Sequence, residues 1–341
     1  MIIVLRPNAS DAEIAEVERD VQALGYQSHT IKGDVLTVVA AIGDETTHAS
    51  LEALRALPSV DNVLPVQKRY KLISREIHPE PHVVEVGDVK IGGGTLHVIA
   101  GPCSVESLEQ TVSTAEQVKA KGATLLRGGA FKPRTSPYDF QGLGEKGLEI
   151  LAEARRITGL PIVTEVLRET DVPLVAATAD VLQIGARNAL NYALLEVAAS
   201  AGKPILLKRG MAAKVDEWLL AAEYIVKRGN PDVILCERGI RTFETATRNT
   251  LDLSAVAIAK MESRLPVMVD PSHAAGRWDL IPALSKASIA CGADGLVIEV
   301  HCHPESALSD GAQQVTPDTF GEFMDGFGPH IEAAGKVKAW G

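Results

Sequence analysis

Apolar and polar residues along the first 70 positions follow a pattern that predicts strands and helices in turn. The opening run IIVLRP predicts a strand. A helix follows, with a cap at Asp11, a stop at Gly25 and apolar positions at helical spacing: Ile14, Val17, Val21 and Leu24. Residues 29–43 then predict two strands around a turn at Gly33-Asp34, residues 50–57 a second helix and residues 60–66 a last strand. The βαββαβ order is typical of a ferredoxin-like domain.

The apolar pattern changes after residue 70. Residues 83–94, VVEVGDVKIGGG, predict a hairpin that ends in three glycines. From residue 96 onward, eight short apolar runs alternate with helix-like segments: LHVIAG, TLLRGG, PIVTEV, VLQIGA, PILLKRG, VILCERG, PVMVDPS and GLVIEVH. Such runs suit a parallel sheet buried on both faces, and eight strand-helix units favour a (β/α)8 TIM barrel. We therefore expect a regulatory domain over 1–70, a linker with a barrel-bottom hairpin over 71–95, and a catalytic barrel over 96–341.

Composition excludes several classes of protein. The 341 residues carry 34 Lys plus Arg against 44 Asp plus Glu, a formal net charge of −10, which argues against partners such as nucleic acid or an anionic membrane. The N-terminus has no apolar run of signal-peptide length, and no stretch reaches about 18 apolar residues. We expect a cytoplasmic protein whose four cysteines, which show no framework spacing, remain thiols.

Ionisable residues follow almost every predicted barrel strand. In chain order they are Cys103, Arg127, Glu165, Arg187, Lys208, Arg209, Glu237, Arg238, Asp270, His273, Glu299 and His301. Any one of them can be explained as a solvated strand end or an ion pair. The C-terminal strand ends of a TIM barrel surround a single mouth, however, and carry the chemistry of enzymes with this fold. The whole set therefore predicts an active site there.

The basic members of this set predict an anion site. Arg127, Lys132, Arg134, Arg187, Lys208 and Arg238 would face one cleft, and Arg suits bidentate contact with phosphate or carboxylate. In the loop over residues 127–140, Gly128 and Gly129 allow close backbone approach, and Thr135 and Ser136 offer hydroxyl donors. An ordinary surface loop with a basic bias is the alternative. We expect more than one anionic group to bind.

A second subset offers metal ligands. Cys103, His273, Glu299 and Asp310 provide a thiolate, an imidazole and two carboxylates, which suits a divalent metal ion such as Mn, Fe, Zn or Co. Cys103 and Glu299 follow the first and last strands, which become neighbours when a barrel closes. Two alternatives stay open at this point. Cys103 can be a small buried hydrophobe, and the other three can act as acids and bases without metal.

The motifs also resemble a known family. GPCSVES, LLRGGAFKPRTSPYDFQGLG, QIGARN, LLKRGM, CERGIRTFE, VDPSHAAG and IEVH with ALSDG are similar to those of the 3-deoxy-D-arabino-heptulosonate 7-phosphate (DAHP) synthases that carry an N-terminal ferredoxin-like regulatory domain. The resemblance covers nearly all of the chain from about residue 70. It implies condensation of phosphoenolpyruvate with erythrose 4-phosphate, at the start of aromatic amino-acid synthesis. It also implies that Cys103, His273, Glu299 and Asp310 are the metal ligands.

The same resemblance implies roles around the substrates. Arg127, Lys132 and Lys208 would surround the phosphoenolpyruvate carboxylate, Arg187 and Arg238 its phosphate, and Arg134 with Thr135 the sugar phosphate. Pro133 and Ala186 belong to the same substrate-binding motifs, KPRTS and QIGARN. Lys132 would protonate the alkoxide that forms, so that the catalytic set comprises Lys132, Cys103 and His273. An aromatic amino acid would bind the N-terminal domain as an effector, and relatives favour a homotetramer.

Three further possibilities remain at this stage. Cys302 stands where the family usually has a proline-containing segment, so a redox disulfide between Cys302 and Cys103 is one hypothesis and neutral drift its alternative. The related 3-deoxy-D-manno-octulosonate 8-phosphate synthases share the barrel and a GPC motif, although KPRTSP argues against them. A non-catalytic amino-acid sensor is the third, which the intact set of catalytic and metal-ligating residues disfavours.

Overall fold

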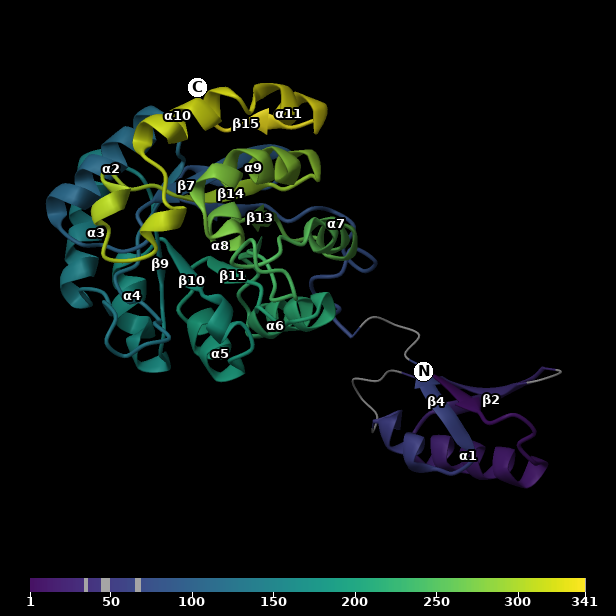
Figure 1. Cartoon of the computed structure of the whole chain (residues 1–341). Coiled ribbons are helices and arrows are strands. Elements are labelled where there is room, and N and C mark those ends of the chain that lie inside the picture. The colour runs from purple at the N-terminus through teal and green to yellow at the C-terminus, as the bar shows by residue number, and fades with distance from the viewer. Residues whose placement is uncertain (34–35, 44–49, 65–68, 341) are drawn as a thin grey trace. The chain divides into compact units, whose positions relative to one another are not determined.

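The computed structural model describes residues 1–33, 36–43, 50–64 and 69–340. The chain divides into two compact units, Met1–Arg69 and Tyr70–Gly341 (Figure 1). Each unit has its own hydrophobic core. In the described part of the chain no helix has the length and apolar character needed to cross a bilayer.

In its described residues, the N-terminal unit is a four-stranded antiparallel sheet with one α-helix and one 3-10 helix. The strands are β1 (Ile2–Leu5), β2 (Gln27–Lys32), β3 (Thr37–Ile42) and β4 (Val60–Leu64), in the order β2-β3-β1-β4. Helix α1 (Asp11–Ala23) packs Ile14, Val17 and Val21 in the same core as Ile3 and Leu5 of β1. The predicted ferredoxin-like βαββαβ order is confirmed.

Two local predictions in this unit are wrong. Ser10, not Asp11, caps α1, because the Ser10 hydroxyl accepts from the Glu13 N–H at 3.4 Å while Glu13 accepts from the Ser10 N–H at 2.7 Å. The second helix is a 3-10 helix, η1 (Leu51–Ala56). Leu57 precedes a proline, which disfavours helical geometry, and its ψ is 133°. The turn residue Asp34 and the last predicted strand residues, 65–66, lie outside the described residues.

The second unit contains the predicted barrel. Its parallel strands are β7 (Thr95–Gly101), β8 (Leu125–Arg127), β9 (Ile162–Glu165), β10 (Val181–Ile184), β11 (Ile205–Lys208), β12 (Val233–Glu237), β13 (Val267–Val269) and β14 (Gly295–Glu299). Pairing of β14 with β7 closes the barrel, and the register places Glu299 opposite Gly101. The predicted (β/α)8 TIM barrel is therefore confirmed, and its strands are ringed by helices (Figure 1).

The helices and the remaining strands complete the second unit. The main helices are α2 (Leu108–Ala120), α3 (Glu145–Thr158), α4 (Val172–Thr178), α5 (Tyr192–Ser200), α6 (Val215–Lys227), α7 (Leu253–Glu262), α8 (Pro271–Ala275), α9 (Ile281–Ala290), α10 (Pro317–Asp325) and α11 (Gly328–Ala333). The short 3-10 helices are η2 (Glu169–Asp171), η3 (Ala186–Asn188), η4 (Trp278–Leu280), η5 (Pro304–Ser306) and η6 (Gly311–Gln313). At the end of the chain, β15 (Val337–Lys338) pairs with the start of β7.

A hairpin precedes the barrel and packs into its interior. Strands β5 (Val84–Val86) and β6 (Val89–Ile91) are antiparallel. Val84, Val86 and Ile91 share a buried cluster with barrel residues such as Leu125 and Val181, each the first residue of its strand. The hairpin therefore fills the N-terminal end of the barrel with apolar side chains, which leaves the opposite end for polar chemistry.

Candidate active site

The candidate site is a polar cleft at the C-terminal ends of the barrel strands. Sixteen residues line it: Arg127, Lys132, Pro133, Arg134, Thr135, Asp139, Glu165, Gln183, Gly185, Ala186, Arg187, Lys208, Arg238, Arg248, His273 and Asp310. All nine residues that were predicted to bind substrate are among them. Seven of the sixteen are Lys or Arg and three are Asp or Glu, so the cleft is strongly basic in an acidic protein. Such a cleft attracts anions.

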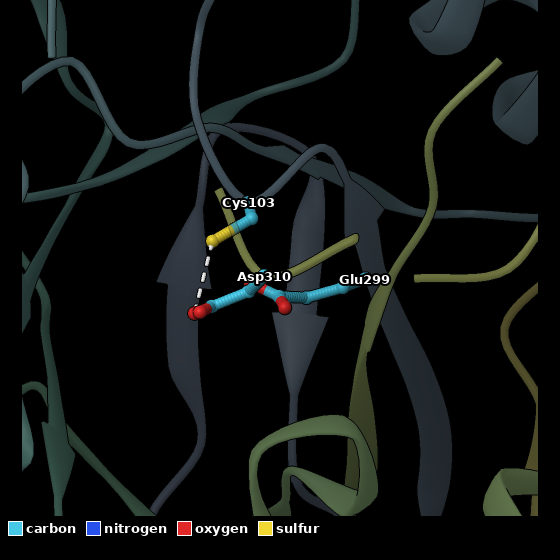
Figure 2. A group of neighbouring side chains, drawn as sticks. All are labelled: Cys103, Glu299 and Asp310. Atoms are coloured by element: carbon cyan, nitrogen blue, oxygen red, sulfur yellow. Dashed lines mark hydrogen bonds between the residues drawn. The ribbon is translucent and has the colours of Figure 1, made fainter. Parts of the chain in front are cut away.

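Three of the four predicted metal ligands form one compact group. Cys103 follows β7, Glu299 ends β14 and Asp310 lies in the loop beyond it, and one donor atom from each falls within 4.8 Å of the other two (Figure 2). The Cys103 thiol donates to Asp310 Oδ2 at 3.5 Å. Asp310 has a φ of 49°, in the left-handed region that non-glycine residues rarely adopt. The loop therefore holds Asp310 in an uncommon conformation beside Cys103.

The fourth predicted ligand, His273, lies beside Glu299 but does not come within 4.8 Å of all three of these donors. His273 Nδ1 is 2.7 Å from Asp270 Oδ2, and Nε2 is 3.6 Å from Glu299 Oε1. Burial lowers the pKa of His273 to about 4, although Asp270 and Glu299 act in the opposite direction. The ring is therefore neutral at neutral pH. Because Nδ1 donates to Asp270, Nε2 carries the lone pair that faces Glu299, as in a metal-ligating histidine held by a carboxylate.

Each of the three grouped donors also faces a cation. Arg127 Nη1 is 2.5 Å from Glu299 Oε1, Lys132 Nζ is 3.0 Å from Cys103 Sγ, and Arg248 Nη1 is 3.3 Å from Asp310 Oδ2. Burial opposes ionisation of Asp310, yet Arg248 and other nearby cations hold its pKa well below the usual range. Burial also opposes ionisation of Glu299, but Arg127 and Lys132 are among the groups that bring its pKa below the usual value overall. Both carboxylates are therefore ionised at neutral pH.

The Cys103 thiol behaves differently. Its pKa is raised to about 11, first by complete burial and then by the charge of Glu299. A divalent ion that binds here must displace the thiol proton. The donor set of sulfur, imidazole nitrogen and carboxylate oxygen fits a first-row transition metal or zinc better than calcium or magnesium, which prefer oxygen ligands alone. The residues present fit the predicted metal.

The basic side of the cleft contains a buried polar atom that a bound anion could satisfy. Arg127 is buried, and its Nε has no hydrogen-bond partner within the described part of the chain. A buried polar atom of this kind is costly unless something binds it.

Gly129 allows close packing between Lys132 and Cys103. A Cβ built on Gly129 would lie 2.6 Å from Lys132 Cδ and 2.8 Å from the Cys103 carbonyl oxygen. Only glycine at position 129 allows Lys132 and Cys103 to approach each other this closely.

Several predicted substrate residues already contact other groups. Lys208 Nζ is 2.5 Å from Asp270 Oδ2, so Asp270 joins Lys208 to His273. Arg187 lies in η3, one short turn beyond β10, and donates to the Thr135 hydroxyl at 3.3 Å. Lys208 and Arg187 are therefore each held in place by a neighbouring side chain.

Glu165 is the third carboxyl group of the cleft. It ends β9, is buried, and accepts a hydrogen bond from Gln183 at 3.3 Å. Burial raises its pKa, although Lys132 and Lys208 act to lower it. A Cβ on Gly185 would lie 1.9 Å from Glu165 Oε1, so glycine there makes room for the carboxyl group. Within the described residues, Glu165 has no cation at ion-pair distance.

Some members of the strand-end set do not reach the cleft. Arg209 Nη1 is 3.0 Å from Glu237 Oε2 and 2.9 Å from Asp252 Oδ2, and this buried network lies behind the cleft rather than lining it. His301 is paired with Glu106. The ion-pair alternative therefore holds for Arg209 and Glu237, whereas the contact of His301 with Glu106 is a hydrogen bond.

Arg248 and Gln313 are among the residues that the sequence analysis did not assign to the site. Arg248 lines the cleft and binds both Asp310 and Gln313, and Gln313 in turn donates to Glu299 Oε2 at 2.6 Å. Arg248 belongs to the long loop after β12, and a basic residue in a loop at the C-terminal end of the barrel is the signal that could have identified it. Nothing in the local sequence marks Gln313.

The four cysteines are free thiols. Cys103 is fully buried and Cys302 is half-buried. A disulfide between Cys103 and Cys302 stays a prediction. Counting free thiols after mild oxidation would test it. It would be rejected if a Cys302→Ala variant lost activity to oxidant as fast as the unmodified chain.

Comparison with known proteins gives consistent matches over the whole chain. The model of the DAHP synthetase I family matches residues 68–332, and that of the DAHP synthase ferredoxin-like domain matches residues 1–68. A phospho-2-dehydro-3-deoxyheptonate aldolase from Thermotoga maritima is 52% identical over 324 residues, 95% of this chain and 96% of the relative. A crystal structure of an enzyme of that name from the same organism superposes with a TM-score of 0.94 at 50% identity, covering 99% and 98% of the two chains.

A more distant relative represents the rival family. A 2-dehydro-3-deoxyphosphooctonate aldolase from Methylobacillus flagellatus is 35% identical over 238 residues, which are 63% of this chain and 84% of the relative. This similarity is lower and covers less of the chain than the similarity to the Thermotoga protein.

Proposed function

The chain belongs to the DAHP synthetase I family and is an enzyme of that family, and from this premise we propose that it condenses phosphoenolpyruvate with D-erythrose 4-phosphate and water, giving DAHP and phosphate. The observation that carries the proposal is one cleft that joins seven cationic side chains to a group of sulfur and carboxylate metal ligands. Two phosphorylated substrates need the cations, and an aldehyde electrophile benefits from the metal.

Phosphoenolpyruvate binds in the deeper part of the cleft in this proposal. Arg127, Lys132 and Lys208 are all buried, and they would surround its carboxylate. Arg187 and Arg238 would hold its phosphate, with Ala186 beside them. Binding at Arg127 would also satisfy the guanidinium nitrogen that has no partner in the described structure.

Erythrose 4-phosphate binds towards the loop that follows β8. Arg134 and Thr135 would hold its phosphate, with Pro133 shaping the loop between them and Lys132. Arg134 Nη1 is 4.0 Å from Asp310 Oδ1, so this phosphate site adjoins the metal-ligand group. The sugar's aldehyde end would therefore lie near Cys103 and Asp310, and the fixed cations would hold two anions in reactive geometry despite their repulsion.

The residues then divide the chemistry. Phosphoenolpyruvate C3 attacks the aldehyde carbon, and Lys132 gives a proton to the alkoxide that forms. Burial lowers the pKa of Lys132, but the acidic groups around it, Cys103 and Glu299 among them, raise it overall, so the lysine carries that proton at neutral pH. A divalent ion (Mn, Fe, Zn or Co) held by Cys103, His273, Glu299 and Asp310 would supply Lewis acidity towards the aldehyde oxygen.

Water must then add to C2 of the former phosphoenolpyruvate, and we assign Glu165 to this step. Its raised pKa and buried position suit a base that takes the water proton as the new C–O bond forms. Phosphate leaves by cleavage of its bond to C2. Cleft cations, with Arg187 and Arg238 nearest in this proposal, would stabilise the departing charge.

The N-terminal unit is proposed to be regulatory. Its match to the DAHP synthase ferredoxin-like domain supports binding of an aromatic amino acid, tyrosine or phenylalanine, as an effector. A homotetramer and a cytoplasmic location are proposed on the same grounds of family membership. Equilibrium dialysis with each aromatic amino acid, and sedimentation velocity with and without it, would test the first two proposals.

Substrate choice separates the proposed function from its rival. We expect phosphate release from phosphoenolpyruvate with erythrose 4-phosphate and at most a trace with arabinose 5-phosphate. Activity with the pentose alone would assign the chain to the octulosonate class instead. No phosphate release with either sugar, in protein that binds tyrosine or phenylalanine, would favour the amino-acid sensor.

A further inference from the structure

The three grouped ligands of Figure 2 come from three separate segments, and something must hold those segments together. Cys103 lies in the loop after β7, Glu299 ends β14, and Asp310 stands directly before η6. A shift of any one segment by about 1 Å would spoil the ligand geometry. The side chains that join these segments therefore help to set the geometry of the ligands.

One carboxylate contacts all three segments. Glu106 follows Cys103 by three positions, and its Oε1 accepts the backbone N–H of Leu308 at 2.9 Å, two positions before Asp310. Its Oε2 is 3.4 Å from His301 Nε2, two positions after Glu299. The Glu106 side chain is 11% exposed and that of His301 3%, so solvent competes little for these bonds.

The hydrogen-bond pattern fixes the direction of the His301 contact. His301 Nδ1 accepts the backbone N–H of His303 at 2.9 Å, so Nδ1 carries no hydrogen. The ring hydrogen must then be on Nε2, which donates to Glu106. A carboxylate can accept from both His301 and Leu308, whereas an amide in its place would present one acceptor oxygen and one donor nitrogen.

A second contact links the same two loops. The hydroxyls of Ser104 and Ser309 are 2.5 Å apart and both are buried. Ser104 also donates to Glu106 Oε1 at 3.4 Å. The residues beside Cys103 and Asp310 are thus joined in one network centred on Glu106.

We propose that Glu106 is a positioning residue for the metal centre, which fixes the Asp310 loop and the end of β14 against the Cys103 loop. This inference rests on the proposed metal site. It gives Glu106, within the GPCSVES motif, a role that none of the site assignments above contains. Groups that orient metal ligands typically change metal affinity about 10- to 100-fold when removed.

The test is metal affinity, measured by competition with a chelator for Mn²⁺ and Co²⁺ in stripped full-length protein. Glu106→Ala should weaken binding about 10- to 100-fold. It should also alter the cobalt-thiolate absorption band. The metal affinity of Glu106→Gln should lie between those of Glu106→Ala and the unmodified chain, because its single amide oxygen can accept from Leu308 or from His301 but not from both. Glu109→Gln, an exposed glutamate three positions on, is the matched control and should bind metal as the unmodified chain does.

The outcomes separate this inference from the proposed function. If Glu106→Ala folds and binds both metals with unchanged affinity and spectrum, the positioning role is wrong while the metal site stands. If Glu106→Ala does not fold, Glu106→Gln decides, and unchanged affinity there contradicts the role. If the unmodified chain binds no metal and still turns over, the proposed metal site fails and this inference with it.

Discussion

Both ends of the barrel contain charged side chains, but these are paired with opposite charges at the N-terminal end and only partly paired at the C-terminal end. At the N-terminal end, Asp294 precedes β14 and is 2% exposed. It accepts the Val267 N–H at 2.8 Å and pairs with Lys260 at 2.7 Å and Lys336 at 2.8 Å. Asp180 before β10 likewise accepts the Ile162 N–H at 2.7 Å and pairs with Arg155. These carboxylates are saturated with protein donors.

At the C-terminal end, charge is left over. The cleft has seven cations against three carboxylates, and the buried Arg127 Nε has no partner in the described residues. Removal of one partner from a closed network at one end leaves an uncompensated buried charge, whereas the excess of one charge at the other end costs stability until a ligand supplies the opposite charge. Substitutions at the two ends should therefore have separable effects.

Removal of the Lys132 ammonium group from the cleft should have the largest effect on activity. We expect Lys132→Ala to lower kcat about a thousandfold, because it removes both the proposed acid and a cation next to both substrates. Its unfolding midpoint should change little. Steady-state kinetics with urea unfolding measure both, and Lys146→Ala, an exposed lysine on α3, is the control for charge. Near-normal kcat in Lys132→Ala would remove Lys132 from the mechanism.

Loss of the proposed thiolate should come next. Cys103→Ser should bind Mn²⁺ at least about a hundredfold more weakly, since a direct ligand should matter no less than an outer-shell partner. Chelator competition measures this affinity. Cys291→Ser, at the end of α9 with its thiol on the Leu253 carbonyl, should leave affinity unchanged. Equal affinity in both variants would leave Cys103 as a small buried hydrophobe.

The opposite end should give a stability effect without a kinetic one. Asp294→Asn should lower the free energy of unfolding by about 2 kcal/mol, because two lysines lose their carboxylate partner. The kcat of the folded fraction should be unchanged. Asp318→Asn, whose side chain is 92% exposed, should cost less than about 0.5 kcal/mol. A fall in kcat of Asp294→Asn at full folding would contradict the separation of the two ends.

The pH dependence of metal affinity should give a finer test. The pKa of Cys103 is raised to about 11 and that of His273 is lowered to about 4, so between these values one thiol proton must leave for each ion bound. Affinity should then rise about tenfold per pH unit from pH 6 to 9. Chelator competition at several pH values measures the slope. Cys103→Ser should flatten it, and an unchanged slope in that variant would show that another group releases the proton.

The sequence was a good guide wherever the chemistry follows from strand register. Apolar runs located all eight barrel strands, and many of the ionisable residues at their ends line the cleft or belong to the group of Cys103, Glu299 and Asp310, because strand ends of a closed barrel converge. The pattern could not separate cleft residues from ones behind it. Arg209 and Glu237 stand at strand ends too, and only their mutual pairing with Asp252 removes them from the site.

Contacts between loops were beyond prediction from the pattern. Arg248 reaches Asp310 across 62 positions of sequence, and Glu106 reaches Leu308 across 202. Neither contact leaves a periodic signal, because loop positions follow from tertiary packing and not from strand or helix periodicity. The capping error at Asp11 has a local cause: two adjacent residues could both cap, and the reciprocal bonds between Ser10 and Glu13 favoured the serine.

In the proposed function, one cleft with a bound metal ion joins two phosphorylated substrates. The most direct test is phosphate release from phosphoenolpyruvate by metal-stripped protein with erythrose 4-phosphate, before and after Mn²⁺ is added. We predict no phosphate release before the metal is added and turnover after it, with no turnover of arabinose 5-phosphate in either case. Full turnover by protein shown to be free of metal, or no turnover after Mn²⁺, Fe²⁺, Zn²⁺ and Co²⁺ have each been restored, would contradict the account.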